Sequence, residues 1–559
     1  MWRVGHLAYG FAVRLRKRNS LCALAGISFR TSSTKTAPLR TRMEYQDAVC
    51  TLNTLQTNAS ALEQIRQGRS NPQLQLQAMI GFIERSGLTV DKLDNLNIIH
   101  VTGTKGKTSN LYVFFFLSSP HLVQVRERIR INGHPVGKEL FAKYFWQVYG
   151  RLFETKMNSE TMPAYFRFLT ILAFHVFLQE KVDLAIIEVG IGGAYDCTNI
   201  IRHPWVCGIS SLGIDHTQIL GDTIEKIAWQ KGGIFKPGVP AFTVKQPEDA
   251  MRVLKDRAKE IGCSLQVCPS LVDYDSDCVP VTLGLAGQHQ LPNASLALQL
   301  SHAWLKRKCL LGEKSVNCYT WKLSMKLFIC VCCDLGLADT EWPGRNQTLK
   351  HGDITYYLDG AHTMRSMLAC VQWFKETAAQ HELNASGPVT RVLLFNSSGE
   401  RDSAAMLKLL VPCHFDYAVF CPNITEAIAS CNADQQNFNV SVDYMLTRCL
   451  DNESSWRLHN SSPQDQVSPQ RLIGDAPCLV PEKNAETLVF PCILSSLQWI
   501  AQGKDSVLVN PDKTQLPVKP SVMAKAALLR EATEIHVLIT GSLHLVGGAL
   551  KHLDPAMSI

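Results

Sequence analysis

The first 42 residues of this 559-residue chain contain no aspartate and no glutamate, whereas arginine, lysine and serine recur throughout them. An acid-free, Arg-rich and Ser-containing leader is typical of a mitochondrial transit peptide, and we expect residues 1–42 to be one. A disordered basic tail is the alternative. Met43 starts a normally acidic segment, so initiation there predicts a cytosolic form without the leader.

Three further absences exclude classes of protein. No run of about 20 apolar residues occurs, so no membrane-spanning helix is expected. No secretory signal precedes the 19 cysteines, and no second pair completes zinc-ligand spacing near Cys330, Cys332 and Cys333, so we expect reduced intracellular thiols. The formal charge of +7 is modest and partly confined to the leader, so it does not indicate a nucleic-acid partner.

Apolar runs of strand length alternate with helical stretches in the first half of the chain. The runs at 96–101, 183–188 and 206–210 each lead into a polar motif, and a helix is expected over 166–179. This alternation predicts an α/β fold with a mostly parallel, P-loop-type sheet. In such sheets ligands bind at the carboxyl ends of the strands.

A second alternation predicts a Rossmann-like C-terminal domain. Its strands are expected at 354–358, 391–395, 417–420 and 535–540. The Pro343-Gly344 turn separates the two alternations, so we place the N-terminal domain at 43–345 and the C-terminal domain at 346–559. The polar stretch 451–488 is predicted to be a mobile insertion in the second domain.

Seven polar motifs occur in order, most of them directly after expected strands. The first, Gly103-Thr-Lys-Gly-Lys107-Thr-Ser109, is a glycine-rich loop whose N–H groups and lysine can cradle phosphates. It is not a full Walker A motif, because its first glycine lies four residues before Lys107 where that pattern needs six. The other motifs are Ser118-Ser119-Pro120-His121, Glu188-Val-Gly-Ile-Gly-Gly193, Gly213-Ile-Asp-His216, Gln230-Lys231-Gly-Gly233, Glu341-Trp-Pro-Gly-Arg345 and Leu358-Asp359-Gly-Ala-His362.

Each motif alone also has a purely structural interpretation. A carboxylate at a strand end beside a nucleotide is a natural magnesium ligand, but Glu188 could equally pair with a surface base. His216 could be an ordinary loop histidine, and Lys231 could be solvated. Together, the motifs supply a phosphate cradle, a hydroxyl, a carboxylate and an imidazole for a cation, and a second nucleotide clamp. That combination favours an enzyme that uses ATP to activate a carboxylate.

The ordered set of motifs resembles the folylpolyglutamate synthase family and, more broadly, the Mur ligases. The stretches 118–133, 182–199 and 215–238 are similar to the animal mitochondrial and cytosolic members, and the similarity covers most of residues 43–559. The resemblance implies that ATP phosphorylates the terminal γ-carboxylate of a tetrahydrofolate and that L-glutamate then attacks the acyl phosphate. It further implies folate polyglutamates and L-glutamate as partners, a role in one-carbon metabolism, a monomer, and association with the mitochondrial inner membrane.

The resemblance also assigns roles to individual residues. ATP would be bound by Gly103, Gly106, Lys107, Thr108, Ser109, Arg345, Asp359 and His362. Magnesium would be held by Ser119, Glu188 and His216, and a monovalent cation is also implied. The folate would lie near Ser118, Ser119, Pro120 and His121. Lys107, His216 and Lys231 would be catalytic, with Lys231 as a carbamate, because an ammonium would repel magnesium whereas a carbamate is anionic.

Two stretches depart from the pattern of the family. Only residues 108–117 separate Lys107 from the Ser118 motif, whereas a parallel crossover needs about a dozen residues or more including its helix. If 111–117 is a strand rather than a helix, the dipole of the phosphate-binding helix is largely absent. The stretch 318–338 also does not match. Both suggest a gene-model fault or a splice variant, so we expect weak ATP binding by the chain as written.

Two other functions are compatible with the same motifs. A dihydrofolate synthase joins glutamate to dihydropteroate by the same chemistry, and motifs separate the two enzymes poorly. An inactive isoform that only binds ligand is the second alternative, and the shortened loop region is the reason to consider it.

Overall fold

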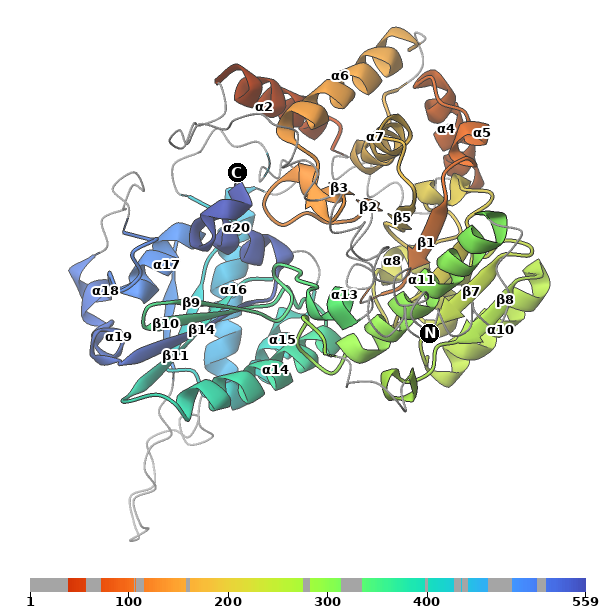
Figure 1. Cartoon of the computed structure of the whole chain (residues 1–559). Coiled ribbons are helices and arrows are strands. Elements are labelled where there is room, and N and C mark those ends of the chain that lie inside the picture. Colours follow the sequence, from red (N-terminus) through yellow and green to blue (C-terminus); the bar gives the residue numbers. More distant parts are fainter. Residues whose placement is uncertain are drawn as a thin grey trace, which may run out of the picture. The chain divides into compact units, whose positions relative to one another are not determined.

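The chain divides into two compact units, which are shown in the computed structural model of Figure 1. The first comprises Met1–Ser119 and Arg126–Glu341, and the second comprises Pro120–Val125 and Trp342–Ile559. The structure describes residues 39–56, 72–104, 106, 115–156, 161–274, 282–312, 334–397, 401–426, 434, 441–460, 485–509 and 519–558.

This division differs from the predicted single boundary at residue 345. The second unit begins at Trp342, and it also includes the short segment Pro120–Val125 from the first half of the chain. The physical reason is burial, because Leu122 and Val123 belong to the hydrophobic core of the second unit. Chain order alone therefore misassigned this segment.

The first unit is built on a sheet in which β1 lies between β5 and β6. In sheet order the described strands are β4 (His134–Pro135), β3 (Ile129–Ile131), β2 (Phe115–Leu117), β5 (Ala185–Glu188), β1 (Ile98–Thr102), β6 (Val206–Ile209), β7 (Pro240–Thr243) and β8 (Ser264–Val267). From β2 to β8 all neighbours are parallel, and only the β2–β3 and β3–β4 pairs are antiparallel. The three strands expected from the apolar runs are confirmed as β1, β5 and β6.

Helices of the first unit cover this sheet. They are α2 (Leu39–Asn53), α4 (Pro72–Arg85), α5 (Val90–Leu93), α6 (Lys138–Glu154), α7 (Tyr165–Gln179), α8 (Thr217–Leu220), α9 (Ile224–Gly232), α10 (Glu248–Ile261), α11 (Gln290–Gly312) and α13 (Asp334–Ala338). The expected helix over 166–179 is confirmed as α7. Because α2 begins at Leu39, its first turn includes the last residues of the predicted leader; the rest of the leader lies outside the described residues.

The second unit contains a sheet whose described strands are all parallel except one. In order they are β13 (Glu486–Val489), β12 (Tyr417–Phe420), β11 (Val389–Phe395), β14 (Glu534–Thr540), β10 (Ile354–Leu358) and β9 (Gln347–His351), and only β9 is antiparallel. The four predicted strands are confirmed here. With the first sheet, this confirms the predicted fold class of two mostly parallel α/β sheets.

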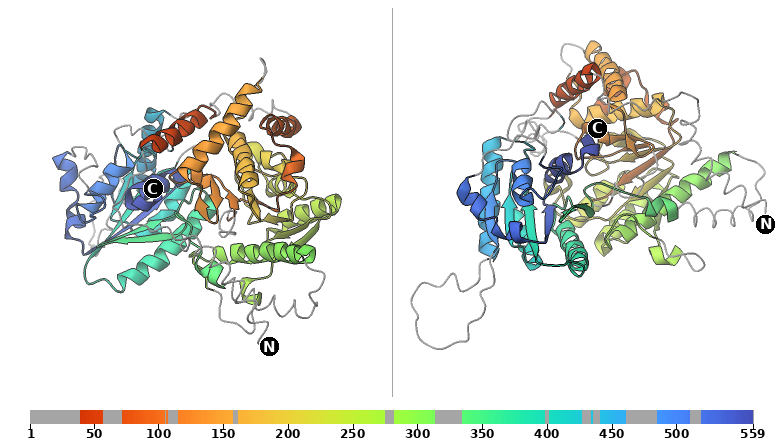
Figure 2. Two further views of the ribbon diagram at one scale, coloured as in Figure 1. Left: turned by 45° about the horizontal axis from the view of Figure 1, so that its top comes forward. Right: turned by 60° about the vertical axis from the view of Figure 1, so that its left-hand side comes forward.

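Side chains alternate between the two faces of this second sheet, so both faces are covered. Ile354, Tyr356 and Leu358 of β10 belong to one core, together with residues of α17 (Ile493–Ala501) and α20 (Leu543–Leu553). Tyr357 belongs to the other core, together with residues of α14, α15 and α16. The bounds of these and the remaining helices are α14 (Met364–Glu382), α15 (Ser403–Leu410), α16 (Val442–Asn460), α18 (Pro520–Ala524) and α19 (Ala527–Glu531). Figure 2 shows the helices from two further sides.

The predicted insertion at 451–488 was wrong at both ends. Residues 451–460 form the second half of α16, and 486–488 belong to β13. The helix is rich in polar residues because much of its surface is exposed, yet Cys449, Asn452 and Trp456 on its inner face are buried. Residues 461–484 lie outside the described part of the chain.

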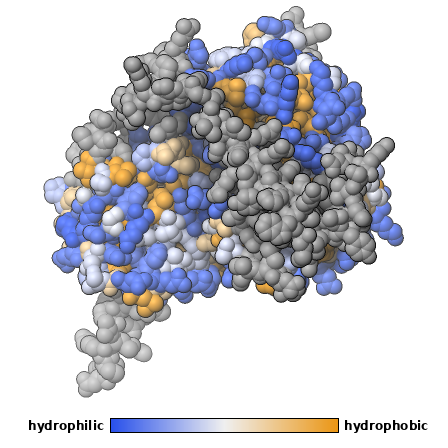
Figure 3. Space-filling view, in the orientation of Figure 1, coloured by the Kyte–Doolittle hydropathy of each residue, from blue (hydrophilic) through white to orange (hydrophobic). Residues whose placement is uncertain are grey.

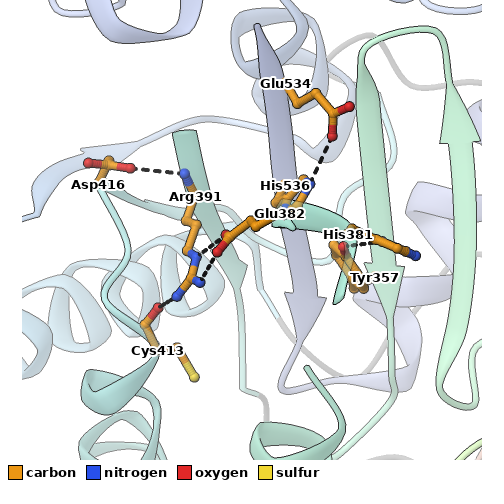
Figure 4. A network of polar contacts seen from close by, with 8 residues as sticks. All are labelled: Tyr357, His381, Glu382, Arg391, Cys413, Asp416, Glu534 and His536. Carbon is orange, nitrogen blue, oxygen red and sulfur yellow. Dashed lines mark hydrogen bonds and ion pairs between the residues drawn. The ribbon is translucent and has the colours of Figure 1, made fainter. Parts of the chain in front are cut away.

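Helix α14 is fixed at both ends, which matters because its N-terminus follows a predicted nucleotide motif. At its start, Thr363 and Ser366 form a capping box. At its end, Glu382 accepts two hydrogen bonds of 2.6 Å from the Arg391 guanidinium of β11 (Figure 4). The neighbouring His381 Nδ1 lies 2.7 Å from the Tyr357 hydroxyl. These polar contacts hold the helix against the sheet.

Hydrophobic residues are also present on the surface of the described part of the chain. On the face shown in Figure 3, hydrophobic residues lie in separate groups among hydrophilic ones. Among the helices that the structure describes, none is both long and apolar enough to cross a bilayer.

Candidate functional site

The predicted motifs of the first unit lie at the carboxyl edge of its sheet. Gly103 directly follows β1, Glu188 ends β5, and Ser118 directly follows β2, while the motif of His216 comes after β6. The chain leaves β1 toward β2 on one side and reaches β6 on the other side. The carboxyl edge beside β1 is therefore the topological switch point at which open α/β sheets bind ligands.

The glycine loop is held against the loop that follows β6. A Cβ atom on Gly103 would lie 1.8 Å from the Ser210 Oγ, so only glycine fits this approach. The next residue, Thr104, donates its N–H to the Ser211 carbonyl at 3.0 Å and its hydroxyl to the Gly213 carbonyl at 3.1 Å. Glycine at 103 thus serves close packing of two loops as well as access to a ligand.

Asn293 is a site residue that sequence reasoning missed. A Cβ atom on Gly106 would lie 2.2 Å from the Asn293 Oδ1, so this buried amide packs directly on the glycine loop. Its Nδ2 donates to Gln290 Oε1 at 2.9 Å, which orients the amide. Both residues come from the first turn of α11, and a Gln-x-x-Asn spacing at the start of a helix was the available signal.

The side chain of Lys231 connects its own motif, at the end of α9, to the glycine loop after β1. It lies in the last turn of α9 and is only 4% exposed, which excludes the solvated alternative. Its Nζ donates to the Gly103 carbonyl at 2.9 Å. The glycines around Gly193 permit this arrangement, because a Cβ atom there would lie 2.7 Å from the Gln230 carbonyl at the end of the same helix.

Glu188 is buried at 1% exposure at the end of β5. Burial argues against the alternative in which it pairs with a surface base. The parallel register of β2 and β5 sets Leu117 opposite Ile187, so the next residue, Ser118, continues the register opposite Glu188. Ser119 follows one residue later. Two of the three predicted metal ligands therefore come from the ends of adjacent strands.

His216 is exposed and has a left-handed backbone conformation, with φ of 52° and ψ of 40°. This conformation is uncommon outside glycine and asparagine and places the residue at the start of the short helix α8. Its N–H donates to Asp215 Oδ1 at 2.9 Å. The strand β6 that precedes it is separated from β5 by β1, so His216 approaches the switch point from the side opposite Ser119.

The other predicted ATP-binding residues of the glycine loop are Lys107, Thr108 and Ser109, and they lie outside the described residues. Phe115–Leu117 forms β2, which resolves the end of the 111–117 segment as strand. Residues 103–114 are thus all that connects β1 to β2. The predicted folate motif is divided, because Ser118 and Ser119 belong to the first unit and Pro120 and His121 to the second.

In the second unit, the two remaining motifs form one connected structure. The Gly360 N–H donates to the Gly344 carbonyl at 3.0 Å, and the Asn346 N–H donates to Asp359 Oδ2 at 2.9 Å. The Arg345 guanidinium lies beside Gly360, and His362 Nδ1 lies 2.7 Å from the Gly360 carbonyl. The structure therefore brings the predicted nucleotide residues of this unit together.

The carboxyl edge of the second sheet adds polar residues that the sequence analysis did not single out. Ser542 follows β14 and caps α20, and its Oγ accepts a hydrogen bond of 3.2 Å from the Asn423 side chain. The cluster around Asp359 follows the neighbouring strand β10. A strand leading into Gly-Ser at a helix start was the signal for Ser542.

One buried histidine beneath the first site has a strongly altered pKa. His100 lies within β1, and its Nε2 is 3.0 Å from the Thr198 hydroxyl. Burial, together with a smaller contribution from the positive charge of Lys236, lowers the pKa of His100 to about 3. His100 is therefore a neutral core residue at physiological pH and not a proton donor.

The residues of the first site fit a divalent cation that is shared with a nucleotide. Among the described residues, no group of three or more His, Cys, Asp and Glu side chains is arranged to hold a metal. A buried carboxylate with a serine hydroxyl supplies the hard oxygen ligands that Mg²⁺ prefers, and Mg²⁺ usually takes its other ligands from phosphates and water. The donor set is therefore suited to a metal–nucleotide complex rather than to an all-protein metal cage.

Comparisons with known proteins point in one direction. No family model matches the chain. A mitochondrial folylpolyglutamate synthase from Homo sapiens is 55% identical over 553 residues, covering 93% of this chain and 94% of the relative. A Mycobacterium tuberculosis folylpolyglutamate synthase complexed with ADP has a TM-score of 0.62 at 19% identity, covering 92% of this chain and 99% of that one. A Yersinia pestis bifunctional folylpolyglutamate synthase/dihydrofolate synthase, complexed with AMPPNP and a Mn ion, has a TM-score of 0.54 at 21% identity, covering 87% and 93%.

Proposed function

The chain belongs to the folylpolyglutamate synthase family, and from this premise we propose how its two groups of residues serve the reaction. The enzyme is an ATP-dependent ligase that adds L-glutamate to the γ-carboxylate of a folate. A carboxylate is a poor acyl donor, so the reaction needs a phosphorylated intermediate. A γ-carboxylate oxygen attacks the terminal phosphorus of ATP and ADP leaves. The glutamate amine then attacks the acyl carbon, phosphate leaves with that oxygen, and the amine loses a proton.

The glycine loop between Gly103 and Ser109 holds the ATP phosphates in this proposal. The observation that supports it most is the 2.9 Å contact from Lys231 Nζ to the Gly103 carbonyl, because it fixes the loop beside the buried Glu188 strand. A loop whose N–H groups are fixed before the reaction stabilises developing phosphate charge without reorganisation. Gly103, Gly106 and Lys107 are assigned to this role, with Thr108 and Ser109.

Glu188, Ser119 and His216 hold the magnesium ion of the ATP complex in this proposal. A divalent cation held by these residues would neutralise phosphate charge that otherwise repels the attacking carboxylate. Glu188 is a buried carboxylate at the end of β5, and carboxylate oxygens are ligands that Mg²⁺ prefers. Lys231 is assigned as a carbamate, which would keep one N–H for the Gly103 carbonyl and would supply two oxygens that share one negative charge.

In the second unit, Arg345, Asp359 and His362 are assigned to nucleotide binding. Asp359 is 7% exposed and already accepts the Asn346 N–H, so its carboxylate is held in one orientation. The helix α14 starts directly after this motif, and its N-terminal N–H groups favour an anion. His362, in the same loop, assists phosphate or glutamate binding. The folate is assigned to the Ser118–His121 segment.

The test of this function is ATP-dependent incorporation of labelled L-glutamate into tetrahydrofolate by the purified chain. Equimolar ADP and phosphate should form with each glutamate added. A folate with ¹⁸O in its γ-carboxylate should pass one labelled oxygen to phosphate, because that oxygen leaves with the phosphoryl group. Product formed without labelled phosphate would exclude the acyl phosphate. If no product forms, the remaining interpretation is the non-catalytic isoform that only binds ligand.

Dihydrofolate synthase activity is the second candidate, and one of the similar structures carries a bifunctional name. The same assay with dihydropteroate as acceptor separates the two activities. Incorporation into tetrahydrofolate alone supports polyglutamylation, whereas incorporation into dihydropteroate alone supports the alternative.

The relative from Homo sapiens is named mitochondrial, which supports the assignment of residues 1–42 as a leader. We expect the full chain to enter mitochondria and a chain starting at Met43 to remain cytosolic with the same specific activity. Both forms can be compared as fluorescent fusions after fractionation. Import of the chain that starts at Met43 would overturn the assignment.

A further inference from the structure

Gln246 is a buried side chain whose amide takes the place of a neighbouring strand. It follows β7 by three residues and is 9% exposed. Its Nε2 donates to the Ser210 carbonyl at 2.9 Å, while its Oε1 accepts the Leu212 N–H at 2.9 Å. In a parallel sheet, one residue donates to and accepts from two residues of the neighbouring strand. The Gln246 amide makes the same pair of hydrogen bonds to residues 210 and 212, just beyond the end of β6.

The segment that Gln246 holds is the same one that supports the glycine loop. Ser210 Oγ lies against Gly103, and Thr104 hydrogen-bonds to both Ser211 and Gly213. Among the described residues, Gln246 makes no hydrogen bond to the glycine loop itself. It fixes the 210–213 segment from the side of β7, and that segment fixes the glycine loop from the other side.

The orientation of the Gln246 amide is determined by a third contact. Its Nε2 also lies 3.0 Å from the Thr243 Oγ1, and that hydroxyl donates to the Ile209 carbonyl at 3.0 Å. The amide cannot be turned round without placing its oxygen against the Ser210 carbonyl. The contacts therefore specify a side chain with one donor end and one acceptor end, which the amide of glutamine and a protonated carboxylic acid both provide.

We infer that Gln246 is a positioning residue for the phosphate-binding loop, acting through residues 210–213. The inference rests on the proposed function of the glycine loop. Removing the amide leaves the Ser210 carbonyl and the Leu212 N–H without these bonds, and the 210–213 segment can then shift. A shift of about 1 Å in a group that positions phosphate can cost roughly a hundredfold in rate.

The direct test compares Gln246→Met with Gln299→Met in the full chain. Methionine is similar in size and lacks the amide in both cases. Gln299 lies on α11 of the same unit and donates one hydrogen bond of 2.7 Å to the Tyr274 hydroxyl, so it controls for loss of a polar contact. We expect Gln246→Met to raise the Kd for magnesium-ATP, measured by calorimetry, about tenfold. The control variant should bind ATP like the unaltered chain.

A second variant keeps the test decisive if Gln246→Met does not fold. In Gln246→Glu, a protonated acid donates to the Ser210 carbonyl and accepts from Leu212, whereas the ionised form presents two acceptors. Its ATP affinity relative to the unaltered chain at the same pH should therefore be lower at about pH 8 than at about pH 6. A merely structural role would give no such pH dependence.

The outcomes separate this inference from the proposed function. If the unaltered chain does not bind ATP, the proposed function of the loop fails. If Gly103→Ala, whose Cβ would clash with Ser210, weakens ATP binding but both Gln246 variants bind normally, the function stands and the inference fails. A tenfold loss in Gln246→Met with an unchanged KM for glutamate supports positioning of the phosphate loop.

Discussion

Replacing Lys231 separates its two proposed contributions, which are a tether to the glycine loop and a carbamate beside the metal. The tether is the hydrogen bond of 2.9 Å from Nζ to the Gly103 carbonyl. A hydrogen bond to a charged group contributes roughly 1.5–3 kcal/mol, so losing the tether alone costs about 10- to 150-fold in ATP binding. Loss of an anionic group that acts on the transition state costs about 100- to 1000-fold in kcat instead.

Two substitutions divide these effects. Lys231→Met removes both contributions. Lys231→Arg keeps an N–H donor for the Gly103 carbonyl, but a guanidinium stays protonated and does not form a carbamate. We expect both variants to lose at least about a hundredfold in kcat, and only the methionine variant to show the full rise in the KM for ATP. The assay is glutamate incorporation at varied ATP and saturating folate.

The carbamate itself can be observed directly. The unaltered enzyme in ¹³C-bicarbonate should show a carbamate carbon signal that is absent from Lys231→Arg. An arginine variant with unchanged kcat would refute the carbamate and leave Lys231 as a tether. Unchanged kinetics in both variants would refute the entire role assigned to this lysine.

Four further outcomes are expected. Glu188→Gln should raise the magnesium concentration needed for half-maximal turnover at least about tenfold, and an unchanged value would make Glu188 structural. Inserting a family-length helix after Ser109 should tighten ATP binding, and equal affinity would make the short connection a tolerated variant. Asn452→Leu should raise the Tm, because neither the nitrogen nor the oxygen of the buried Asn452 amide makes a hydrogen bond among the described residues, and leaving such a group unpaired costs about 1–3 kcal/mol. A lower Tm would indicate that the amide has a polar role. The pKa of His100 is about 3 in the folded chain and 6.5 ordinarily, so between these pH values the unfolded chain binds more protons and stability falls as pH falls. His100→Gln should therefore reduce the slope of the unfolding free energy against pH in this window by up to about 1.4 kcal/mol per pH unit. An identical slope in the two proteins would contradict this expectation.

The strands of both sheets could be predicted because a buried parallel strand needs little besides a short apolar run. The β1, β5 and β10 segments are buried along their whole length, and each was visible in the sequence for that reason. The polar motifs after them could be placed at one edge because parallel strands end together.

The contacts that shape the site could not be predicted, because they depend on side chains far apart in the chain. Asn293 lies 187 positions after Gly106, and nothing local marks either residue as the partner of the other. The same holds for Leu122, whose apolar side chain suits either core. The sequence does not specify which core Leu122 enters. The structure shows that it is buried in the core of the second unit.

The described part of the glycine loop bears on how much the short connection to β2 matters. Gly103 is held by Lys231 at its carbonyl, Thr104 by the segment after β6, and Gly106 by the packing of Asn293. None of these contacts comes from a helix that follows the loop. If the short connection provides no helix, the loss is mainly that of a helix dipole, which contributes about 0.3–1 kcal/mol and up to ~2 kcal/mol in partly buried sites. On this reasoning the weak ATP binding expected from the short connection amounts to a deficit of about tenfold, because neighbouring elements already fix the described part of the loop.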